Sequence, residues 1–181
     1  SIAPVISLFG ESNATHEAGT LYHDPGATAY DAFSGDVTDA ISVSGDVNTS
    51  ETGLYFLTFS VSDAAGNFGQ VVREVKVVDT MAPTLTLHGD LNVTVEAGFG
   101  VASLNFSATA QDLLDGDLTA SINVSSNVND NVQGDYILSY SVSDKAGNAA
   151  IARERIIRIR DTLPPVLRLL GEREITLAPG T

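Results

Sequence analysis

The chain has 181 residues, of which 23 are acidic and 9 are basic, so its formal net charge is −14. This charge would repel phosphate backbones and anionic lipids, and it disfavours nucleic acid and membrane surfaces as partners. Cysteine is absent, which excludes disulfides and thiolate metal sites. Hydrophobic residues make up 43% of the chain, enough for a folded core, and no apolar run approaches the ~20 residues of a membrane span.

Short stretches of alternating polarity predict β-strands along 1–79. The expected strands are 5–9, 14–17, 26–30, 41–44, a short one around Val47, 54–63 and 69–78. Within 54–63, the core face is predicted to carry Tyr55, Leu57, Phe59 and Val61. The dipeptide Gly66-Asn67 favours a turn and predicts a hairpin between the last two strands. Six or seven short strands without a helical segment predict a two-sheet β-sandwich.

The same motifs return after the length of one small domain. The sequence Ser-Val-Ser-Asp-x-Ala-Gly-Asn occurs at 60–67 and again at 141–148. We therefore expect an all-β chain of tandem domains. The predicted domains are 1–79, 80–161 and, as the start of a truncated third repeat, 162–181. The third segment is too short to fold alone.

The spacing between the repeats changes at two places, and each change predicts an insertion. Two extra residues follow Gly98 in a loop. The spacing then grows by one more residue between Asn148 and Asp161. This extra residue lies within a predicted strand, so we expect a β-bulge at 152–155.

Several motifs together carry a family resemblance. They are x-x-Pro-x-Ile/Leu-x-Leu-x-Gly, a Glu-Ala-Gly turn, Ala-Thr-Ala-x-Asp, Gly-Asp-Leu/Val-Thr and Ser-Val-Ser-Asp-x-Ala-Gly-Asn. The chain resembles the bacterial-type Ig-like domains found in tandem on surface adhesins, in secreted glycosidases and in some insecticidal crystal proteins, with hyalin repeats as cousins. The resemblance covers both complete repeats and implies tandem Ig-like sandwiches, located outside the cell or on its surface and without catalytic activity.

Catalytic chemistry finds little support in the residues. The histidines His16, His23 and His88 do not recur between repeats, and none has the spacing of metal ligands. No nucleophile or phosphate-binding motif occurs, so we expect no enzyme. Five Asn-x-Ser/Thr sequences are candidate glycosylation sites in a eukaryotic host. Their asparagines are Asn13, Asn48, Asn92, Asn105 and Asn123.

Two functional hypotheses remain open. The first is a stalk or filament module of a repeat-containing surface protein that supports adhesion or assembly. Its partners would be neighbouring Ig-like repeats and, through self-assembly, the partial repeat at 163–181. The second is a glycan- or protein-binding adhesin domain with an unknown receptor, or an accessory domain of a secreted hydrolase or toxin. Exposed aromatic platforms would favour glycan binding, and the candidates are Phe56, Phe68 and Phe99.

The acidic residues predict one metal site. In an Ig-like sandwich, the loop between the second and third strands and the last hairpin tip share the pole where the preceding domain enters. Asp79, which closes the first domain, should therefore meet side chains from two loops of the second. These are Asp112, Asp115, Asp117, Asp144 and Asn148. Calcium accepts about six to eight oxygen ligands, so we expect it here. The alternative is that each Asp serves only a local turn.

Overall fold

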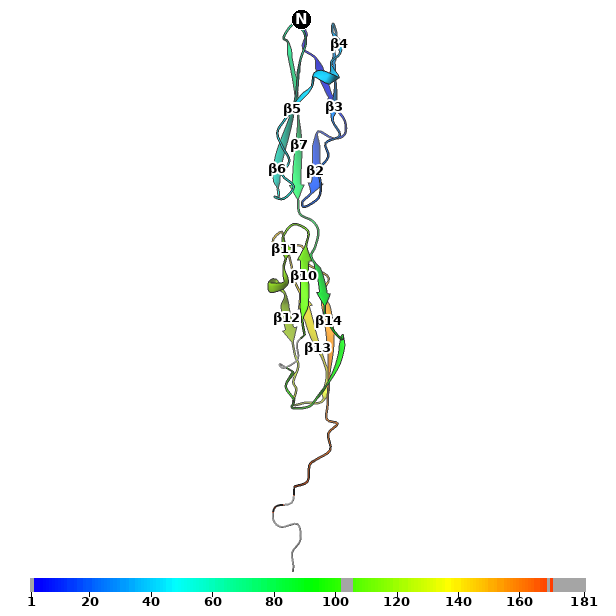
Figure 1. Ribbon diagram of the computed structural model, residues 1–181, viewed down its shortest axis with the longest axis vertical. Helices are drawn as coiled ribbons and strands as arrows, with labels where there is room; N and C mark the ends of the chain where they lie inside the picture. The colour runs from blue at the N-terminus through cyan, green and yellow to red at the C-terminus, as the bar shows by residue number, and fades with distance from the viewer. Residues whose placement is uncertain (1, 102–105, 169, 171–181) are drawn as a thin grey trace, which may run out of the picture. The chain divides into compact units, whose positions relative to one another are not determined.

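The computed structural model describes residues 2–101, 106–168 and 170. Strands dominate both repeats (Figure 1), and the described residues include the one-turn 3-10 helices η1 (Thr38–Ala40) and η3 (Thr119–Ser121). The expectation of no helical segment was therefore wrong at these two turns. The reason is local: an aspartate two residues earlier accepts a hydrogen bond from the Thr38 N–H at 2.9 Å and from the Thr119 N–H at 2.9 Å, which closes a turn.

The first repeat is a sandwich of two sheets with the strand orders β1-β3-β4 and β2-β7-β6-β5. Its strands are β1 (Val5–Leu8), β2 (Asn13–Glu17), β3 (Ala27–Asp31), β4 (Gly35–Asp36), β5 (Ser42–Ser44), β6 (Gly53–Ser62) and β7 (Phe68–Val78). The hairpin β6–β7 is antiparallel, as predicted, whereas β2 lies parallel to β7. The core face of β6 also agrees with the prediction, since Leu57, Phe59 and Val61 are buried.

The second repeat has the same architecture, with the strand orders β11-β10-β8 and β12-β13-β14-β9. Its strands are β8 (Thr84–Leu87), β9 (Asn92–Glu96), β10 (Ala108–Asp112), β11 (Gly116–Asp117), β12 (Asn123–Ser126), β13 (Gly134–Ser141) and β14 (Arg153–Arg160). Leu138 and Tyr140 are buried on β13, and Ile157 and Ile159 are buried on β14. The alternation of polarity that predicted the strands thus also identifies the core residues.

The extra residue of the second repeat interrupts a strand. Ala149 bridges Ser143 in the position that Phe68 takes in the first repeat. Ile156 pairs with β9 in the position that Glu74 takes beside β2. The stretch from Ala149 to Ile156 is one residue longer than the stretch from Phe68 to Glu74, so the insertion lies there, in a range that includes the predicted 152–155. No strand is formed at 150–152, although the Ala150 N–H donates to the Val142 carbonyl at 2.9 Å, so the last strand is shorter than β7.

Two further expectations concern short segments. No strand forms at Val47, and this side chain packs against a small buried cluster of Ala18, Val75 and Val77. In the third-repeat segment, the described residues 163–168 and 170 form no strand, and their large hydrophobic side chains are exposed. Residues 169 and 171–181 of the predicted partial repeat, and residues 102–105 of the loop that contains the predicted insertion after Gly98, lie outside the described residues. Among the residues that are described, no helix has the length and apolar character needed to cross a membrane.

Each repeat buries one arginine in its core, a feature that the sequence analysis did not foresee. Arg73 on β7 and Arg155 on β14 are 1% and 2% exposed. The Arg73 guanidinium donates to three backbone carbonyls and lies 2.9 Å from an Asp24 carboxylate oxygen. It also stacks over Phe59, with 5.8 Å between the guanidinium carbon and the ring centroid. A guanidinium can replace water as the hydrogen-bond partner of several carbonyls at once.

Candidate functional site

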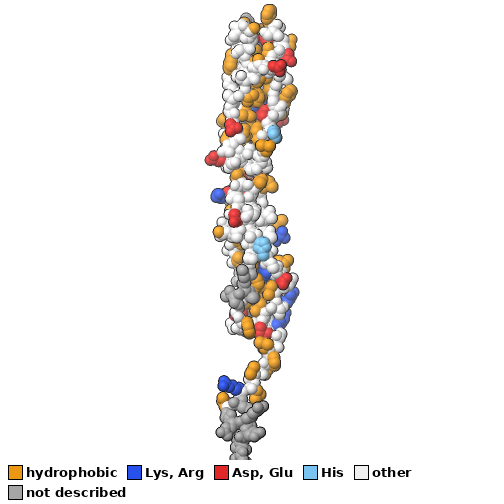
Figure 2. All heavy atoms as spheres, in the orientation of Figure 1, with side chains coloured by type: hydrophobic (Ala, Val, Ile, Leu, Met, Phe, Trp, Pro, Cys, Tyr) orange, Lys and Arg blue, Asp and Glu red, His pale blue; other side chains and the backbone are white. Residues whose placement is uncertain are grey.

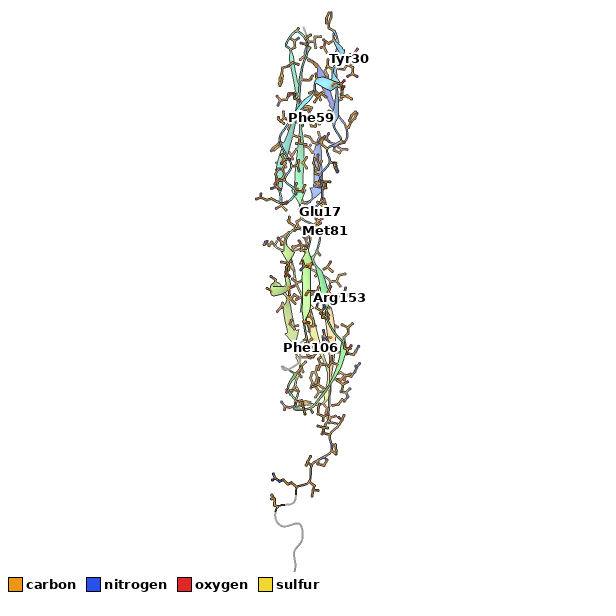
Figure 3. The ribbon with its side chains drawn as sticks, viewed as in Figure 1. Glu17, Tyr30, Phe59, Met81, Phe106 and Arg153 are labelled. Carbon is orange, nitrogen blue, oxygen red and sulfur yellow. The ribbon has the colours of Figure 1, made fainter. Side chains whose placement is uncertain are left out.

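A glutamate at the end of the second strand holds the chain that leaves each repeat. Glu17 accepts hydrogen bonds from the Thr80 N–H at 2.9 Å, the Thr80 hydroxyl at 2.6 Å and the Met81 N–H at 3.2 Å; Figure 3 labels Glu17 and Met81. Glu96 binds the N–H and hydroxyl of Thr162 in the same way, at 2.8 Å and 2.6 Å. We call this arrangement the exit clamp. Hydrogen bonds from the Thr80 hydroxyl and N–H lower the pKa of the Glu17 carboxyl.

Sequence reasoning quoted the Glu-Ala-Gly turn but gave its glutamate no role. The signal was present, because the acceptor Glu17 recurs as Glu96 and the donor Thr80 recurs as Thr162. The acceptor and its donor lie far apart in sequence, which hides the pairing. Only the parallel neighbours β2–β7 and β9–β14 bring them together.

The predicted acidic site lies close to the first exit clamp. One carboxylate oxygen each from Asp79, Asp112 and Asp115 lies within 4.8 Å of the others. All three residues belong to one compact unit, which comprises Ser1–His88, Ser107–Val124 and Tyr140–Arg153. Burial raises the pKa of the Asp79 carboxyl, and the negative charges of its acidic neighbours, Asp144 first, raise it further. We call Asp79, Asp112 and Asp115 the acidic cluster.

Asp112 contributes a buried carboxylate to the acidic cluster, and the residue is 9% exposed. Its Oδ1 accepts hydrogen bonds from the N–H groups of Leu114 at 2.9 Å and Asp115 at 2.8 Å, which closes a turn. Its Oδ2 is buried and has no hydrogen-bond partner. Buried carboxylate oxygens are normally satisfied by a donor, a cation or water.

Asp115 is paired with Lys145. The Lys145 N–H donates to Oδ2 and the ammonium group donates to Oδ1, both at 2.8 Å. These bonds, led by that of the lysine side chain, lower the pKa of Asp115. The lysine side chain is 81% exposed and the Asp115 carboxylate only 7%. The cation is therefore held loosely beside a buried carboxylate.

The remaining predicted ligands lie in different surroundings. Asp144 is 8% exposed, and both of its oxygens accept hydrogen bonds from Asn148. The same Asn148 amide donates to the backbone carbonyl of Asp79 at 3.2 Å, so it links the end of the first repeat to the second. Asp117 is engaged with Thr119 at η3 and is not part of the acidic cluster.

Successive repeats also share an apolar contact in this compact unit. Leu114 packs against the buried cluster of Ala18 and Val75 in the first repeat. Gly19 has a positive φ of 74°, and a β-carbon there would lie 2.8 Å from Leu113 Cγ. The Glu-Ala-Gly turn therefore needs glycine for its backbone and for the close approach of the next repeat.

The pole of the first repeat carries the counterparts of these residues. Phe33 stands where the second repeat has Leu114, and its side chain is 100% exposed. Together with Ile2 and Ala64 it lines a hollow at this pole. The position that is covered in the second repeat is thus an open apolar surface in the first.

The other candidates from the sequence do not assemble into a site. His16 and His88 pair with Thr20 and Thr109 hydroxyls. Phe56 and Phe68 are 50% and 57% exposed. Each pairs with a different part of the β6–β7 ladder, about 20 Å apart along the strands, so they share no platform. Phe99 is 70% exposed.

Charge and sequons are likewise spread over the surface. Acidic side chains lie in separate small groups over the face shown in Figure 2. Four asparagines of the predicted sequons are exposed, namely Asn13, Asn48, Asn92 and Asn123. Asn105 lies outside the described residues. Their glycosylation stays a prediction.

Comparison with known proteins agrees with this architecture. Each of the two repeats has seven strands in two sheets, and each ends in an exit clamp. The family model described as bacterial surface protein, Ig-like domain, matches residues 6–77 and again 85–159. The chain belongs to this family. No curated protein matches the sequence.

Solved structures are similar to this chain at low sequence identity. One contains the M60 catalytic domain with the CBM51-1 and CBM51-2 domains from Clostridium perfringens ZmpB, at 13% identity and a TM-score of 0.50. The match covers 88% of this chain but only 31% of that one. A second comprises fibronectin(III)-like modules of Clostridium thermocellum CbhA, at 15% identity and a TM-score of 0.37, covering 88% of this chain and 95% of that one.

Proposed function

We propose that this chain is a non-catalytic extracellular stalk module, which spaces other parts of a surface protein away from the cell. The observation that carries the proposal is the repeated exit clamp, in which Glu17 and Glu96 hold the outgoing chain with the same three hydrogen bonds. Such a clamp fixes the direction in which the next segment starts. A stalk requires this at every repeat, whereas a binding domain does not.

Contacts between the repeats support the same function. Leu114 packs on the first repeat, and Gly19 permits the close approach of Leu113. Phe33, beside the open hollow, is the counterpart in the first repeat of Leu114. We therefore propose that this hollow receives another Ig-like repeat. Neighbouring repeats are therefore the partners that we propose, and filament assembly through the third-repeat segment remains a further proposal.

Exchange of the whole module tests this function. In the full-length surface protein, residues 1–161 would be replaced by two unrelated Ig-like domains of equal length, and adhesion or assembly of the cells would be measured. A stalk tolerates this exchange but fails when the segment is deleted. Loss of adhesion after the exchange, with normal surface display, would refute the stalk and favour a direct glycan- or protein-binding domain. If the parent protein is a secreted hydrolase, and the same exchange lowers its activity on its substrate, the result would favour an accessory domain.

Phe33 offers the specific observation for the binding alternative, because its side chain is 100% exposed beside a hollow. A glycan-binding platform uses such an aromatic ring. If the hollow receives another repeat, the isolated two-repeat chain should adhere only at background level, both in the wild type and in Phe33→Ala. Specific adhesion that is present in the wild type and lost in this variant would assign the hollow to a receptor.

A further inference from the structure

We propose that the acidic cluster of Asp79, Asp112 and Asp115 binds a calcium ion. The cluster joins Asp79, the residue before Thr80, to the turn between β10 and β11 of the second repeat, within one compact unit. A bound ion would thus tie two repeats together. This inference concerns a metal site and does not depend on whether the module acts as a stalk.

The unpartnered oxygen of Asp112 is the first argument. Oδ1 is already used by two backbone N–H groups, so Oδ2 is the oxygen that remains for a ligand. It is buried without a hydrogen bond, in a side chain that is 9% exposed. A buried carboxylate oxygen that accepts no hydrogen bond is costly unless a cation or a donor compensates it. The neighbouring groups of the cluster are carboxylates, which cannot donate while ionised.

The size and chemistry of the cluster favour calcium over other metals. Calcium–oxygen distances are about 2.3–2.6 Å, so oxygens on opposite sides of one ion lie about 4.6–5.2 Å apart. The three carboxylate oxygens lie within 4.8 Å of one another and can therefore share one ion. The cluster offers only hard oxygen ligands, which calcium prefers, whereas zinc and copper sites are dominated by nitrogen or sulfur ligands. Water would complete the coordination.

Lys145 is the cation that calcium must displace. Its ammonium group lies 2.8 Å from Asp115 Oδ1, at the end of a side chain that is 81% exposed. A flexible, solvated ammonium is easily withdrawn into water. The backbone N–H of Lys145 also donates to Asp115 and would keep this carboxylate oriented while the ammonium leaves. Removing the ammonium should therefore strengthen calcium binding.

The first repeat contains the same aspartate turn without the acidic cluster, and it therefore provides a control. Asp31 forms the same turn as Asp112, with Oδ1 accepting from the N–H groups of Phe33 at 3.0 Å and Ser34 at 2.7 Å, and it is 2% exposed. Ser34, however, stands in place of Asp115, and its N–H and hydroxyl both hydrogen-bond to Asp31 and lower its pKa. Asp31→Asn is thus the control for loss of a buried turn carboxylate.

Calorimetric titration of calcium into the chelator-treated 181-residue chain tests the proposal. We expect one ion per chain, with a dissociation constant of about 0.1–1 mM, as in other extracellular modules. Asp112→Asn keeps the Oδ1 acceptor but removes the charge, and it should weaken binding at least about tenfold, whereas Asp31→Asn should leave it unchanged. Lys145→Gln should tighten binding several-fold. Magnesium should bind more weakly, because it demands a smaller octahedral site.

Asp79→Asn is a second variant, in case Asp112→Asn does not fold. Its backbone carbonyl still accepts from Asn148, so folding should persist while calcium binding weakens at least about tenfold. Circular dichroism would establish the fold of every variant. The proposal is overturned if the wild type takes up no calcium at about 10 mM, or if folded Asp79→Asn binds as well as the wild type. Equal weakening by Asp31→Asn would also overturn it.

Discussion

Replacement of the buried Arg73 should destabilise the first repeat, so that it unfolds at a much lower denaturant concentration. The guanidinium donates to the carbonyls of Phe9 at 2.7 Å, Glu11 at 2.8 Å and Gly26 at 3.1 Å, and it lies 2.9 Å from Asp24 Oδ2. Three segments that are distant in sequence therefore meet at one side chain. Arg73→Met keeps most of the unbranched stem and removes every one of these interactions.

The expected loss follows from the groups left behind. Removing one partner of a buried ion pair costs about 3–5 kcal/mol, because the other partner stays desolvated. Asp24 is 20% exposed and can be rehydrated in part, which lowers the loss. The three carbonyls lose charge-assisted hydrogen bonds of about 1.5–3 kcal/mol each, although such terms are not additive. We therefore expect the free energy of unfolding to fall by about 3–5 kcal/mol, with Arg73→Lys between this variant and the wild type.

Guanidinium chloride unfolding, followed by circular dichroism, measures the effect. Lys76→Met is the matched control, since Lys76 lies three residues along the same strand with an exposed side chain. Surface substitutions of this kind change stability by about 0.5 kcal/mol or less. A loss below about 1 kcal/mol for Arg73→Met, or a loss equal to that of the control, would refute the assignment of Arg73 as a core cross-link.

Two further predictions concern a turn and an exit clamp. Gly45→Ala should destabilise the first repeat by more than about 1 kcal/mol, because Gly45 has a φ of 100° and a β-carbon would lie 2.1 Å from the Phe56 carbonyl oxygen. Gly66→Ala, with a φ of 84° and open space around the β-carbon, is its control in unfolding experiments and should cost less. Hydrogen bonds from the Thr162 hydroxyl and N–H lower the pKa of Glu96, so this clamp should stabilise the fold above the usual glutamate pKa of about 4.3 and weaken as the pH falls through the lower folded value. The Thr162 amide shift in NMR spectra should report this transition, and Glu96→Gln should abolish it; an unchanged titration in that variant would contradict the clamp.

Strand positions could be predicted closely because two local signals agree. Alternating side chains identify β6, and glycine-containing turns bound it, so the prediction of 54–63 differs from Gly53–Ser62 by one residue at each end. The one-turn helix η1 escaped prediction because its three residues carry no hydrophobic period. The Asp36 side chain accepts a hydrogen bond from the Thr38 N–H at the start of this turn, and such a local contact leaves no periodic pattern in the sequence.

Buried polar groups were harder to foresee than strands. Arg73 occupies the inward-facing position between Val71 and Val75 on β7, where a periodicity argument expects a hydrophobic residue. The recurrence of this arginine as Arg155 was visible in the sequence. Its carbonyl partners, however, come from loops, and loop backbones follow no periodic rule.

The acidic cluster shows why repeat sequences must be considered in pairs. Asp112 and Asp31 close identical turns, so a single repeat gives no reason to assign them different roles. The difference arises from two changes around Asp112: Asp115 replaces a serine, and Asp79 arrives from the preceding repeat. Each added carboxylate raises the electrostatic cost of the others. A cation beside the cluster offsets this cost, and Lys145, which replaces an alanine, is the cation that the chain itself supplies.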